Sequence, residues 1–478
     1  MKSSHLICTL ALFTCAAIAS QAGSVPSQPR NSVAMALDPA VPAPGQATVA
    51  ADFNGDGKLD LATTNNKNGG LTIRLGKGDG TFLPAITYRA GYHHNAIVAA
   101  DFNGDGKIDL AVSLPTLCGA CGGFPNYQLQ VYLGVGDGTF NFVAPKYPFY
   151  GLPLVAADFN GDGKADLIVT NTDYYGDDWE AQIMISKGDG TFEKGASLAD
   201  TFYPTYPAVG DLNGDGKLDI ALPALDEIEG LPITYIFLGN GDGTFSTPAS
   251  YAGTNYYGFT AALGDFNGDG KLDIATDAVQ VLLNNGDGTF TNDASVNVRG
   301  WPGGVVTGDF NGDGKIDIAT ENEVGSFPES NLILLGNSDG TFQTVTVEGG
   351  SQVLQAADFN RDGKLDLLTA GGIYLQTPAA VLPTYLYFGS IPVNTKTAPQ
   401  TATLTNVGNV AMTIETIQVI GSSAYSQTNN CGATLAAGKS CQFQLSFEPT
   451  SIGSAAAALS VTVPGAPSST VQLSGAGQ

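Results

Sequence analysis

A nine-residue pattern rich in oxygen ligands recurs seven times along the chain. It reads Asp-Phe-Asn-Gly-Asp-Gly-Lys-x-Asp, with small departures. Carboxylates at positions 1, 5 and 9 and an amide at position 3 are hard ligands, and glycines at positions 4 and 6 allow a turn sharp enough for them to converge. Oxygen ligands at this density suit Ca²⁺ better than zinc or copper. The alternative is a loop closed by Asx turns without an ion, although the three carboxylates would then repel one another.

The sequence therefore predicts up to seven Ca²⁺ sites, each with the backbone carbonyl of position 7 as a further ligand. An EF-hand loop is excluded because it needs a glutamate at position 12, where these copies carry Thr, Val or Leu. Two copies depart from the pattern, with Leu212 at position 2 of the fourth and Arg361 at position 4 of the seventh. The predicted metal ligands are Asp52, Asn54, Asp56, Asp60, Asp101, Asn103, Asp105, Asp109, Asp158, Asn160, Asp162, Asp166, Asp211, Asn213, Asp215, Asp219, Asp265, Asn267, Asp269, Asp273, Asp309, Asn311, Asp313, Asp317, Asp358, Asn360, Asp362 and Asp366.

The pattern belongs to a repeat of roughly fifty residues that spans positions 44–376. A second motif, Gly-Asp-Gly-Thr-Phe, follows six of the copies, once with Ser as its first residue. In the first repeat, strands are expected at 48–51, 59–64, 71–75 and 83–88. Four short antiparallel strands per repeat describe a propeller blade, and the small residues before each first Asp suit strands that crowd a central axis. A β-solenoid would have shorter repeats with fewer turns. We predict an all-β, seven-bladed β-propeller.

The two ends of the repeat region are expected to meet. The seventh repeat ends without its Gly-Asp-Gly-Thr-Phe turn or a fourth strand, and residues 32–37 form an isolated β-compatible segment ahead of the first repeat. We expect this segment to supply the outer strand of blade seven, which would remove an open sheet edge. The propeller is accordingly predicted to span 32–376.

Aromatic side chains recur at a fixed offset from the Asp loops. The residues eight positions before each first Asp are Pro44, His93, Tyr150, Tyr203, Tyr257, Trp301 and Gly350. Propeller symmetry would arrange the aromatic ones around the mouth of the axis, on the face opposite the Asp loops. There they could hold a cation or stack on a sugar, or form an apolar plug.

The loops between the second and third strands of blades two to four are long and carry Tyr, Trp and carboxylates, Trp179 among them. Such side chains suit sugar hydroxyls or a basic peptide, although the same composition is ordinary for solvated loops. The candidate ligand-binding residues are His93, Tyr150, Tyr203, Tyr257, Trp301 and Trp179.

The N-terminus has the pattern of a secretory signal peptide over 1–22, with Lys2 ahead of the apolar run 6–19 and small residues at the cleavage site. No other apolar stretch is long enough to span a membrane. The protein is expected to be secreted and to act outside the cell, on its surface or in a periplasm.

Four cysteines remain after the predicted cleavage. Two local disulfides, Cys118–Cys121 and Cys431–Cys441, are the expectation for an oxidising compartment. A redox role for the first pair is the weaker alternative, because no helix start lies beside it to lower a thiol pKa.

Composition excludes several classes of protein. The chain has 45 acidic and 20 basic residues, a net charge of −25, which excludes a binder that follows nucleic-acid phosphates. Its 62 glycines exclude a helical or coiled-coil protein, and 43% hydrophobic residues exclude an acidic disordered chain. About half of the net charge lies in the repeat loops, so it says little about a partner if cations bind there.

A second domain is expected after a Pro/Ala-rich linker over 377–383. Short strands are predicted at 385–388, 400–405, 412–420, 442–447, 456–463 and 471–473, which is typical of an Ig-like β-sandwich over 384–478. No catalytic grouping appears there, so a spacer, anchor or adhesion module is expected.

Both parts resemble known families. The two repeat motifs are similar to the FG-GAP/VCBS repeats of integrin-α-type seven-bladed propellers. This resemblance implies Ca²⁺ at positions 1, 3, 5 and 9, and aromatic residues on the opposite face that grip a partner's basic side chain. Integrins carry such metal sites in only some blades, so seven occupied sites would extend the resemblance. Segments 388–389, 404–409, 431–441, 447–449 and 473–477 resemble the choice-of-anchor/HYDIN-type Ig-like domains of bacterial surface proteins.

The function predicted from the sequence is that of a secreted, Ca²⁺-binding recognition protein for an extracellular glycan or protein. One alternative is a polysaccharide-active enzyme, such as a lyase, on the same scaffold; another is a purely structural surface component. His93 and His94 are the histidines left after cleavage, and no nucleophile elbow or zinc-protease motif is present. No catalytic residue is predicted, and the oligomeric state is left open.

Overall fold

The computed structural model describes most of the repeat region and of the C-terminal segment. Its described residues are 35–37, 47–65, 70–89, 96–116, 126–143, 152–172, 179–198, 204–225, 231–253, 260–276, 280–293, 304–322, 330–348, 352–377, 379–382, 385–406, 411–464 and 468–478. Within these ranges every regular element is a strand, and no helix occurs that could cross a membrane. The chain divides into two compact units, one with residues 40–309 and 314–373 and the other with residues 374–478, 21–39 and 310–313.

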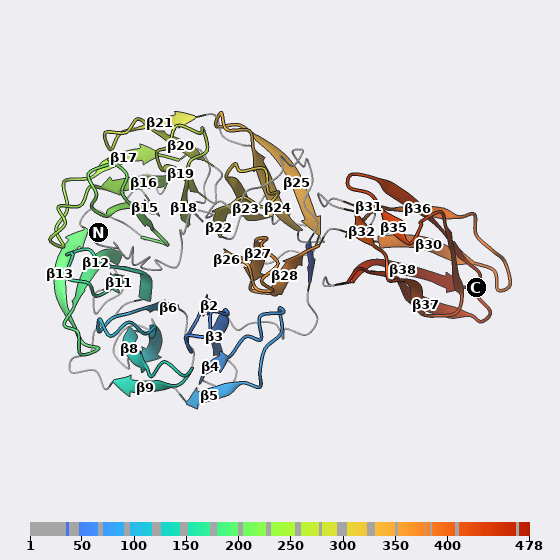
Figure 1. Cartoon of the computed structure of the whole chain (residues 1–478), viewed down its shortest axis with the longest axis horizontal. Helices are drawn as coiled ribbons and strands as arrows, with labels where there is room; N and C mark the ends of the chain where they lie inside the picture. Colours follow the sequence, from blue (N-terminus) through green and yellow to red (C-terminus); the bar gives the residue numbers. More distant parts are fainter. Residues whose placement is uncertain are drawn as a thin grey trace, which may run out of the picture. The chain divides into compact units, whose positions relative to one another are not determined.

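Six antiparallel sheets of four consecutive strands follow one another along the repeats and form blades one to six. Figure 1 shows them side by side around a common centre. Their strands are β2 (Ala47–Ala51), β3 (Asp60–Asn65), β4 (Gly70–Arg74) and β5 (Ile86–Arg89); β6 (Ile97–Ala100), β7 (Asp109–Thr116), β8 (Asn126–Gly134) and β9 (Phe140–Val143); β10 (Leu152–Ala157), β11 (Asp166–Thr172), β12 (Trp179–Ser186) and β13 (Phe192–Leu198); β14 (Ala208–Gly210), β15 (Asp219–Leu225), β16 (Pro232–Phe237) and β17 (Ala249–Ala252); β18 (Ala261–Gly264), β19 (Asp273–Thr276), β20 (Val281–Asn284) and β21 (Phe290–Asp293); β22 (Val305–Gly308), β23 (Asp317–Asn322), β24 (Ser330–Gly336) and β25 (Phe342–Glu348).

The first strand of each blade is innermost, and its small side chains are buried because neighbouring blades press against it. β2 contacts β6, β6 contacts β10, β14 contacts β18, β18 contacts β22, β22 contacts β26 and β26 contacts β2. In β2 and β6, for example, Ala50 and Ala99 are almost fully buried. Because the contact between β26 and β2 joins the last repeat to the first, the blades form a ring.

The seventh sheet has the order β1-β28-β27-β26 and combines both ends of the repeat region. Its strands are β26 (Val353–Ala357), β27 (Asp366–Thr369), β28 (Gly372–Gln376) and β1 (Met35–Leu37). β1 pairs antiparallel with β28, from Met35 opposite Gln376 to Leu37 opposite Tyr374. On the inner side of the ring, the side-chain amide of Gln355 bonds both backbone groups of Ala50, donating to its oxygen (3.3 Å) and accepting from its nitrogen (3.0 Å).

Successive blades are held together by the two sequence motifs. The phenylalanine at loop position 2 of one blade packs edge-to-face on the phenylalanine of the Gly-Asp-Gly-Thr-Phe turn in the next, an arrangement that contributes about 0.5–1.5 kcal/mol beyond burial. The ring centroids lie 5.5 Å apart for Phe53 and Phe140, 5.5 Å for Phe102 and Phe192, 5.7 Å for Phe159 and Phe245, and 5.6 Å for Phe266 and Phe342. The repeated aromatic residues therefore build the interfaces between blades.

A hydrogen bond to the carbonyl of loop position 2, here called the interblade bond, accompanies every one of these interfaces. In four interfaces the donor is the backbone nitrogen of the second turn glycine, and in three it is the polar side chain of the last residue of the third strand. The seven bonds are Gly138 N to Phe53 O (3.2 Å), Ser186 Oγ to Phe102 O (2.5 Å), Gly243 N to Phe159 O (3.0 Å), Asn284 Nδ2 to Leu212 O (2.8 Å), Gly340 N to Phe266 O (3.2 Å), Gln376 Nε2 to Phe310 O (2.5 Å) and Gly80 N to Phe359 O (3.3 Å).

The C-terminal segment forms two four-stranded sheets with a common apolar core, as expected of an Ig-like sandwich. One sheet contains β29 (Ala379–Leu382), β31 (Gln400–Asn406), β36 (Ser440–Phe447) and β34 (Tyr425–Asn429); the other contains β30 (Tyr385–Ile391), β38 (Ser469–Gly477), β37 (Gly453–Thr462) and β33 (Thr416–Gly421). β32 (Met412–Thr413) and β35 (Thr434–Leu435) form a small third pair.

Two expectations for this segment need correction. The predicted linker 377–383 contains β29, which pairs with β31 and buries Ala379 and Val381 in the core, so its alternating small apolar residues are those of a strand. The strand predicted at 412–420 is two strands in different sheets, because the chain crosses between them at Ile414 and Glu415. Their nitrogens donate to Ala433 and Thr462, respectively.

Candidate functional site

The seven Asp loops lie on one face of the propeller ring, because each loop joins the first strand of a blade to the second. The register is the same in every blade, with the last residue of the first strand opposite the Asp of position 9, as in Ala51 opposite Asp60. The same pairing recurs at Asp109, Asp166, Asp219, Asp273, Asp317 and Asp366. The fold therefore gathers the predicted metal ligands into seven equivalent loops.

The aspartate at position 1 closes each loop by accepting bonds from the loop backbone. In the first loop, Asp52 Oδ1 accepts from the nitrogens of Gly55 (2.7 Å) and Asp56 (3.1 Å), and its Oδ2 accepts from Gly57 (2.7 Å). Gly55 and Gly57 have φ of 73° and 78°, a left-handed conformation that glycine adopts without strain. The two glycines of the motif thus turn the backbone nitrogens toward the carboxylate.

Positions 3 and 5 continue this network at the surface. Asn54 Oδ1 accepts from the nitrogen of Asp56 (2.9 Å), and Asp56 Oδ1 accepts from that of Lys58 (3.0 Å). The other carboxylate oxygen of Asp56 forms an ion pair with Lys58 Nζ at 2.9 Å. The hydrogen bond from Lys58 holds the pKa of Asp56 below its ordinary value. Because this pair is exposed, we assign little stability to it.

The aspartate at position 9 lies beneath the loop and is fully buried. Asp60 Oδ2 accepts from the nitrogen of Phe53 (2.9 Å), and Oδ1 accepts from that of Gly76 (2.7 Å). Burial raises the pKa of Asp60 to about 6, despite these two bonds, and the charges of Asp52 and Asp56 add to the increase. This residue therefore joins the loop to the turn that follows the third strand.

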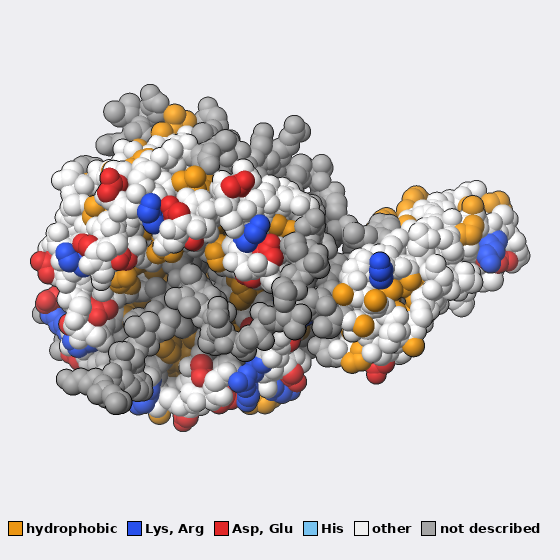
Figure 2. All heavy atoms as spheres, turned by 45° about the horizontal axis from the view of Figure 1, so that its top comes forward, with side chains coloured by type: hydrophobic (Ala, Val, Ile, Leu, Met, Phe, Trp, Pro, Cys, Tyr) orange, Lys and Arg blue, Asp and Glu red, His pale blue; other side chains and the backbone are white. Residues whose placement is uncertain are grey.

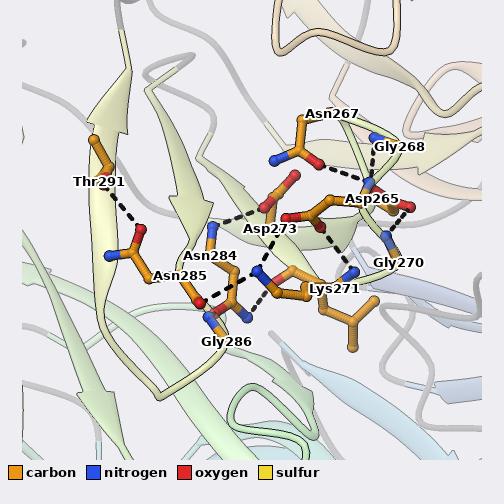
Figure 3. A network of polar contacts seen from close by, with 12 residues as sticks. Asp265, Asn267, Gly268, Gly270, Lys271, Asp273, Asn284, Asn285, Gly286 and Thr291 are labelled. Atoms are coloured by element: carbon orange, nitrogen blue, oxygen red, sulfur yellow. Dashed lines mark hydrogen bonds and ion pairs between the residues drawn. The ribbon is translucent and has the colours of Figure 1, made fainter.

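In blade five these contacts are connected, and Figure 3 shows part of the network around Asp273 and Asn284. Asp273 accepts from the nitrogens of Phe266 (2.9 Å) and Asn284 (2.8 Å). The side-chain amide of Asn284 donates to Leu212 O in blade four and to Leu272 O, both at 2.8 Å. The loop carboxylates, the buried aspartate and the interblade bond are thus parts of one connected set of polar contacts.

The oxygen-rich side chains of the loops suit a hard cation, but they also accept hydrogen bonds within the loop. In the first loop, Asp52 Oδ1 accepts two backbone bonds, whereas Asp52 Oδ2 and Asp56 Oδ1 accept one each and keep a second lone pair for a cation. The carboxylates of positions 1 and 5 also raise the pKa of the buried position-9 group. Among the described residues, no group of three or more His, Cys, Asp or Glu side chains is placed to hold one metal ion. The side chains of positions 1, 3 and 5 lie in the loop itself, whereas both oxygens of the position-9 carboxylate accept hydrogen bonds from backbone nitrogens.

The two departures from the motif keep the loop geometry. Arg361 has a φ of 61°, close to that of the glycines it replaces, and Asp358 still accepts from the nitrogens of Asp362 (3.1 Å) and Gly363 (2.8 Å). An L-residue in this conformation costs about 1–2 kcal/mol. The Arg361 side chain lies so close to Gly78 of blade one that a Cβ there would be 3.1 Å from Arg361 Cδ.

In the fourth loop, Leu212 packs in one apolar cluster with Phe290 of blade five and donates its backbone nitrogen to Asp219. It thereby takes the place that phenylalanine has in the other blades.

The predicted ligand face is only partly described. His93, Tyr150, Tyr203, Tyr257 and Trp301 lie outside the described residues. Trp179 is the first residue of β12 and pairs with Thr172, the last residue of β11. Since β11 begins at Asp166 beside the loop, Trp179 stands at the opposite end of blade three.

Of the predicted disulfides, Cys431 and Cys441 are bonded, with an S–S distance of 2.01 Å and a Cα–Cα distance of 5.1 Å. Cys118 and Cys121 lie outside the described residues.

Several residues that organise the site were not singled out from the sequence. They are Gln355 at the ring closure and the polar side chains of the interblade bonds, Ser186, Asn284 and Gln376. One signal was present: the position at or just after the end of the third strand is Gly in blades one, two, four and six but Ser, Asn or Gln in the others. In the blades with Gly at this position, a Cβ would clash with a backbone oxygen. At Gly76 it would lie 2.0 Å from Leu59 O.

Comparisons with known proteins agree with this architecture. The FG-GAP-like repeat model matches residues 52–112, 120–169, 158–222, 233–276 and 275–320, more than half of the chain. The HYDIN/CFA65/VesB-like Ig-like domain model matches residues 380–476. Both the repeats and the Ig-like domain are typical of binding scaffolds rather than catalytic domains.

Curated relatives and solved structures are more distant. Integrin alpha-PS5 and integrin alpha-PS3 of Drosophila melanogaster are 30% and 29% identical over 150 residues, 27% of this chain but only 15% and 13% of theirs. Two structures from Vibrio cholerae, the secreted serine protease VesC and the VesB protease, are 12% identical to this chain with TM-scores of 0.19. They match 59% and 80% of this chain and 70% and 100% of their own. With seven blades and a matching C-terminal domain, the chain belongs to the FG-GAP-like repeat proteins and carries a HYDIN/CFA65/VesB-like Ig-like domain.

Proposed function

We propose that this protein is a secreted recognition protein whose repeat loops bind Ca²⁺ and whose opposite propeller face binds an extracellular glycan or protein. The observation that carries the proposal is the sevenfold repetition of one loop, with three aspartates and an asparagine, at a single edge of the ring. Seven divalent cations would offset somewhat more than half of the formal net charge of −25. Oxygen ligands of this kind and number suit Ca²⁺.

The residues that would hold each cation are those of positions 1, 3 and 5, with position 9 beneath them. In blade five these are Asp265, Asn267 and Asp269, with Asp273 buried below. The lysine at position 7 now pairs with the position-5 carboxylate, at 3.1 Å between Lys271 and Asp269, and that exposed pair can yield to a cation at little cost. A bound cation would stiffen the loop and, through position 9, the turn of the same blade.

The recognition surface is assigned to the end of the blades opposite these loops. Support comes from the blade geometry, since β11 runs from Asp166 beside the loop to Thr172, which pairs with Trp179. Two of the relatives are integrins, which supports an extracellular role. A role outside the cell also agrees with the disulfide between Cys431 and Cys441.

A glycan array and a protein pull-down, each run with Ca²⁺ and with EDTA, test the recognition role. The combined substitutions Trp179→Ala and Tyr203→Ala should abolish the signals carried by the propeller. Phe142→Ala is the matched control, because this exposed aromatic residue lies on the outer strand β9. Binding that survives the double substitution unchanged would contradict the assignment of this face.

A further inference from the structure

One face of the C-terminal sandwich presents two tyrosines to solvent. Along β30 the side chains alternate, with Leu386 and Phe388 in the core and Tyr385 and Tyr387 outside. The exposed fractions of the two tyrosines are 54% and 60%. Large aromatic side chains are seldom left this exposed in pairs, so this face needs an explanation beyond folding.

The strand register places uncharged residues of the neighbouring strands β38, β37 and β33 beside these tyrosine rings. Tyr385 pairs with Gln472 on β38, which pairs with Ala458 on β37, which in turn pairs with Ile420 on β33. Ile420 is 53% exposed and lies at the far edge. None of the four strands contains a charged residue, although the chain carries a net charge of −25. Figure 2 shows few charged side chains on the visible surface of this unit.

The ring of Tyr385 is held against the neighbouring strand β38 by a hydrogen bond. Its hydroxyl is hydrogen-bonded to Ser474 Oγ at 2.5 Å, two residues beyond the Gln472 with which Tyr385 pairs. The side chain therefore extends over the neighbouring strand instead of projecting away from it. A restrained ring loses less conformational entropy when a ligand stacks on it.

The opposite face of the sandwich lacks these features. Its outward positions on β31 and β36 carry polar side chains such as Thr401 and Gln442, and no exposed large hydrophobic side chain lies on β31, β36 or β34. The strands of both faces lack charged residues, but the exposed tyrosines lie on one face. The Thr/Gln face thus offers an internal control for the tyrosine face.

We propose that the tyrosine face, defined as the outward side of β30, β38, β37 and β33, binds a linear neutral polysaccharide. The faces of aromatic rings attract the C–H groups of a flat sugar ring, and Gln, Ser and Thr side chains offer donors and acceptors to its hydroxyls. Charge complementarity favours a neutral ligand, because the face has no group to pair with an ionic one. Tyr385 and Tyr387 are roughly 6.6 Å apart along the strand, and a flat surface suits an extended chain better than a small ligand, which needs a concave pocket.

The test is affinity gel electrophoresis of the full chain in gels containing hydroxyethyl cellulose, mixed-linkage β-glucan or galactomannan. At least one polymer should retard the protein. The combined substitutions Tyr385→Ala and Tyr387→Ala should weaken this retardation about tenfold or more, whereas Tyr385→Phe, which keeps the ring, should weaken it much less. Thr401→Ala with Thr403→Ala, spaced identically on the other face, should leave it unchanged.

Two further results keep this inference separate from the proposed function. Adding Trp179→Ala and Tyr203→Ala, on the propeller, should not change the factor by which the tyrosine substitutions weaken the retardation. Melting curves should show that every variant is folded. Normal mobility in all three polymers would overturn the proposal, as would equal loss in the threonine variant. A concentration-dependent dimer that disappears in the double tyrosine variant would overturn it in favour of self-association.

Discussion

Replacing Asn284 by alanine is predicted to destabilise the propeller strongly, because this residue joins two blades. Asn284 is buried, and its amide donates to Leu212 O and Leu272 O, both at 2.8 Å, while its Oδ1 accepts from Gly286 N at 2.7 Å. The alanine would leave these three backbone groups without their partner. A buried group left unpaired costs about 1–3 kcal/mol. The bond to Leu212 O is buried and the other two are partly buried, so we expect a loss of about 2–4 kcal/mol in the free energy of unfolding.

The neighbouring residue provides a matched control. Asn285 is exposed, and its side chain bonds those of Thr289 and Thr291 at the surface, so Asn285→Ala should cost no more than about 0.5 kcal/mol. Asn284→Asp keeps the shape but turns a carboxylate oxygen toward two carbonyls, so it should cost more than the alanine.

Urea unfolding followed by tryptophan fluorescence measures these differences. The chain has two tryptophans, both in the repeats, so the signal reports the propeller rather than the sandwich. Equal stability of Asn284→Ala and Asn285→Ala would refute the account of the interblade bond.

Three further outcomes follow from the same structure. Gln355→Leu removes both bonds to Ala50 at the ring closure and should lower the urea midpoint by the equivalent of about 1–3 kcal/mol. Phe140→Ala removes a buried ring that packs on Phe53 and should cost about 3–5 kcal/mol in the same assay. In EDTA, stability should fall as pH rises from 5 to 7. Burial raises the pKa of Asp60, Asp109, Asp166 and Asp273 to about 6, so the folded state retains protons that the unfolded chain has lost. Saturating Ca²⁺ should remove this trend, and a melting temperature that rises over that range in EDTA would contradict the pKa assignment.

Much of the fold could be predicted because the repeat is regular. Seven copies of one motif specify seven blades, and small residues before each loop specify which strand is innermost. The paired Phe53 and Phe140 show what periodicity alone does not reveal, since their contact joins different repeats. The strand Ala379–Leu382 was predicted as a linker because Pro and Ala have low β-propensity, whereas its pairing with β31 and burial of Val381 decide its structure.

The loops illustrate a second limit of the sequence pattern. An aspartate at position 9 is equivalent to those at positions 1 and 5 in the motif, but Asp60 is buried and bonded to Phe53 and Gly76, while Asp56 is exposed. Which oxygen accepts from which nitrogen depends on the blade around the loop. The pattern identifies the chemistry available, and the packing decides how each carboxylate uses it.

Metal stoichiometry tests the central claim, Ca²⁺ binding by the repeat loops, most directly. Protein stripped with EDTA and dialysed against Ca²⁺ should take up several equivalents, at most seven, and its melting temperature should rise. Asp265→Asn with Asp269→Asn should reduce the uptake by one equivalent, whereas Asp287→Asn, in the turn of the same blade, should not change it. Less than one equivalent bound, with the same melting temperature in Ca²⁺ and EDTA, would contradict the account and leave the loops as hydrogen-bonded turns.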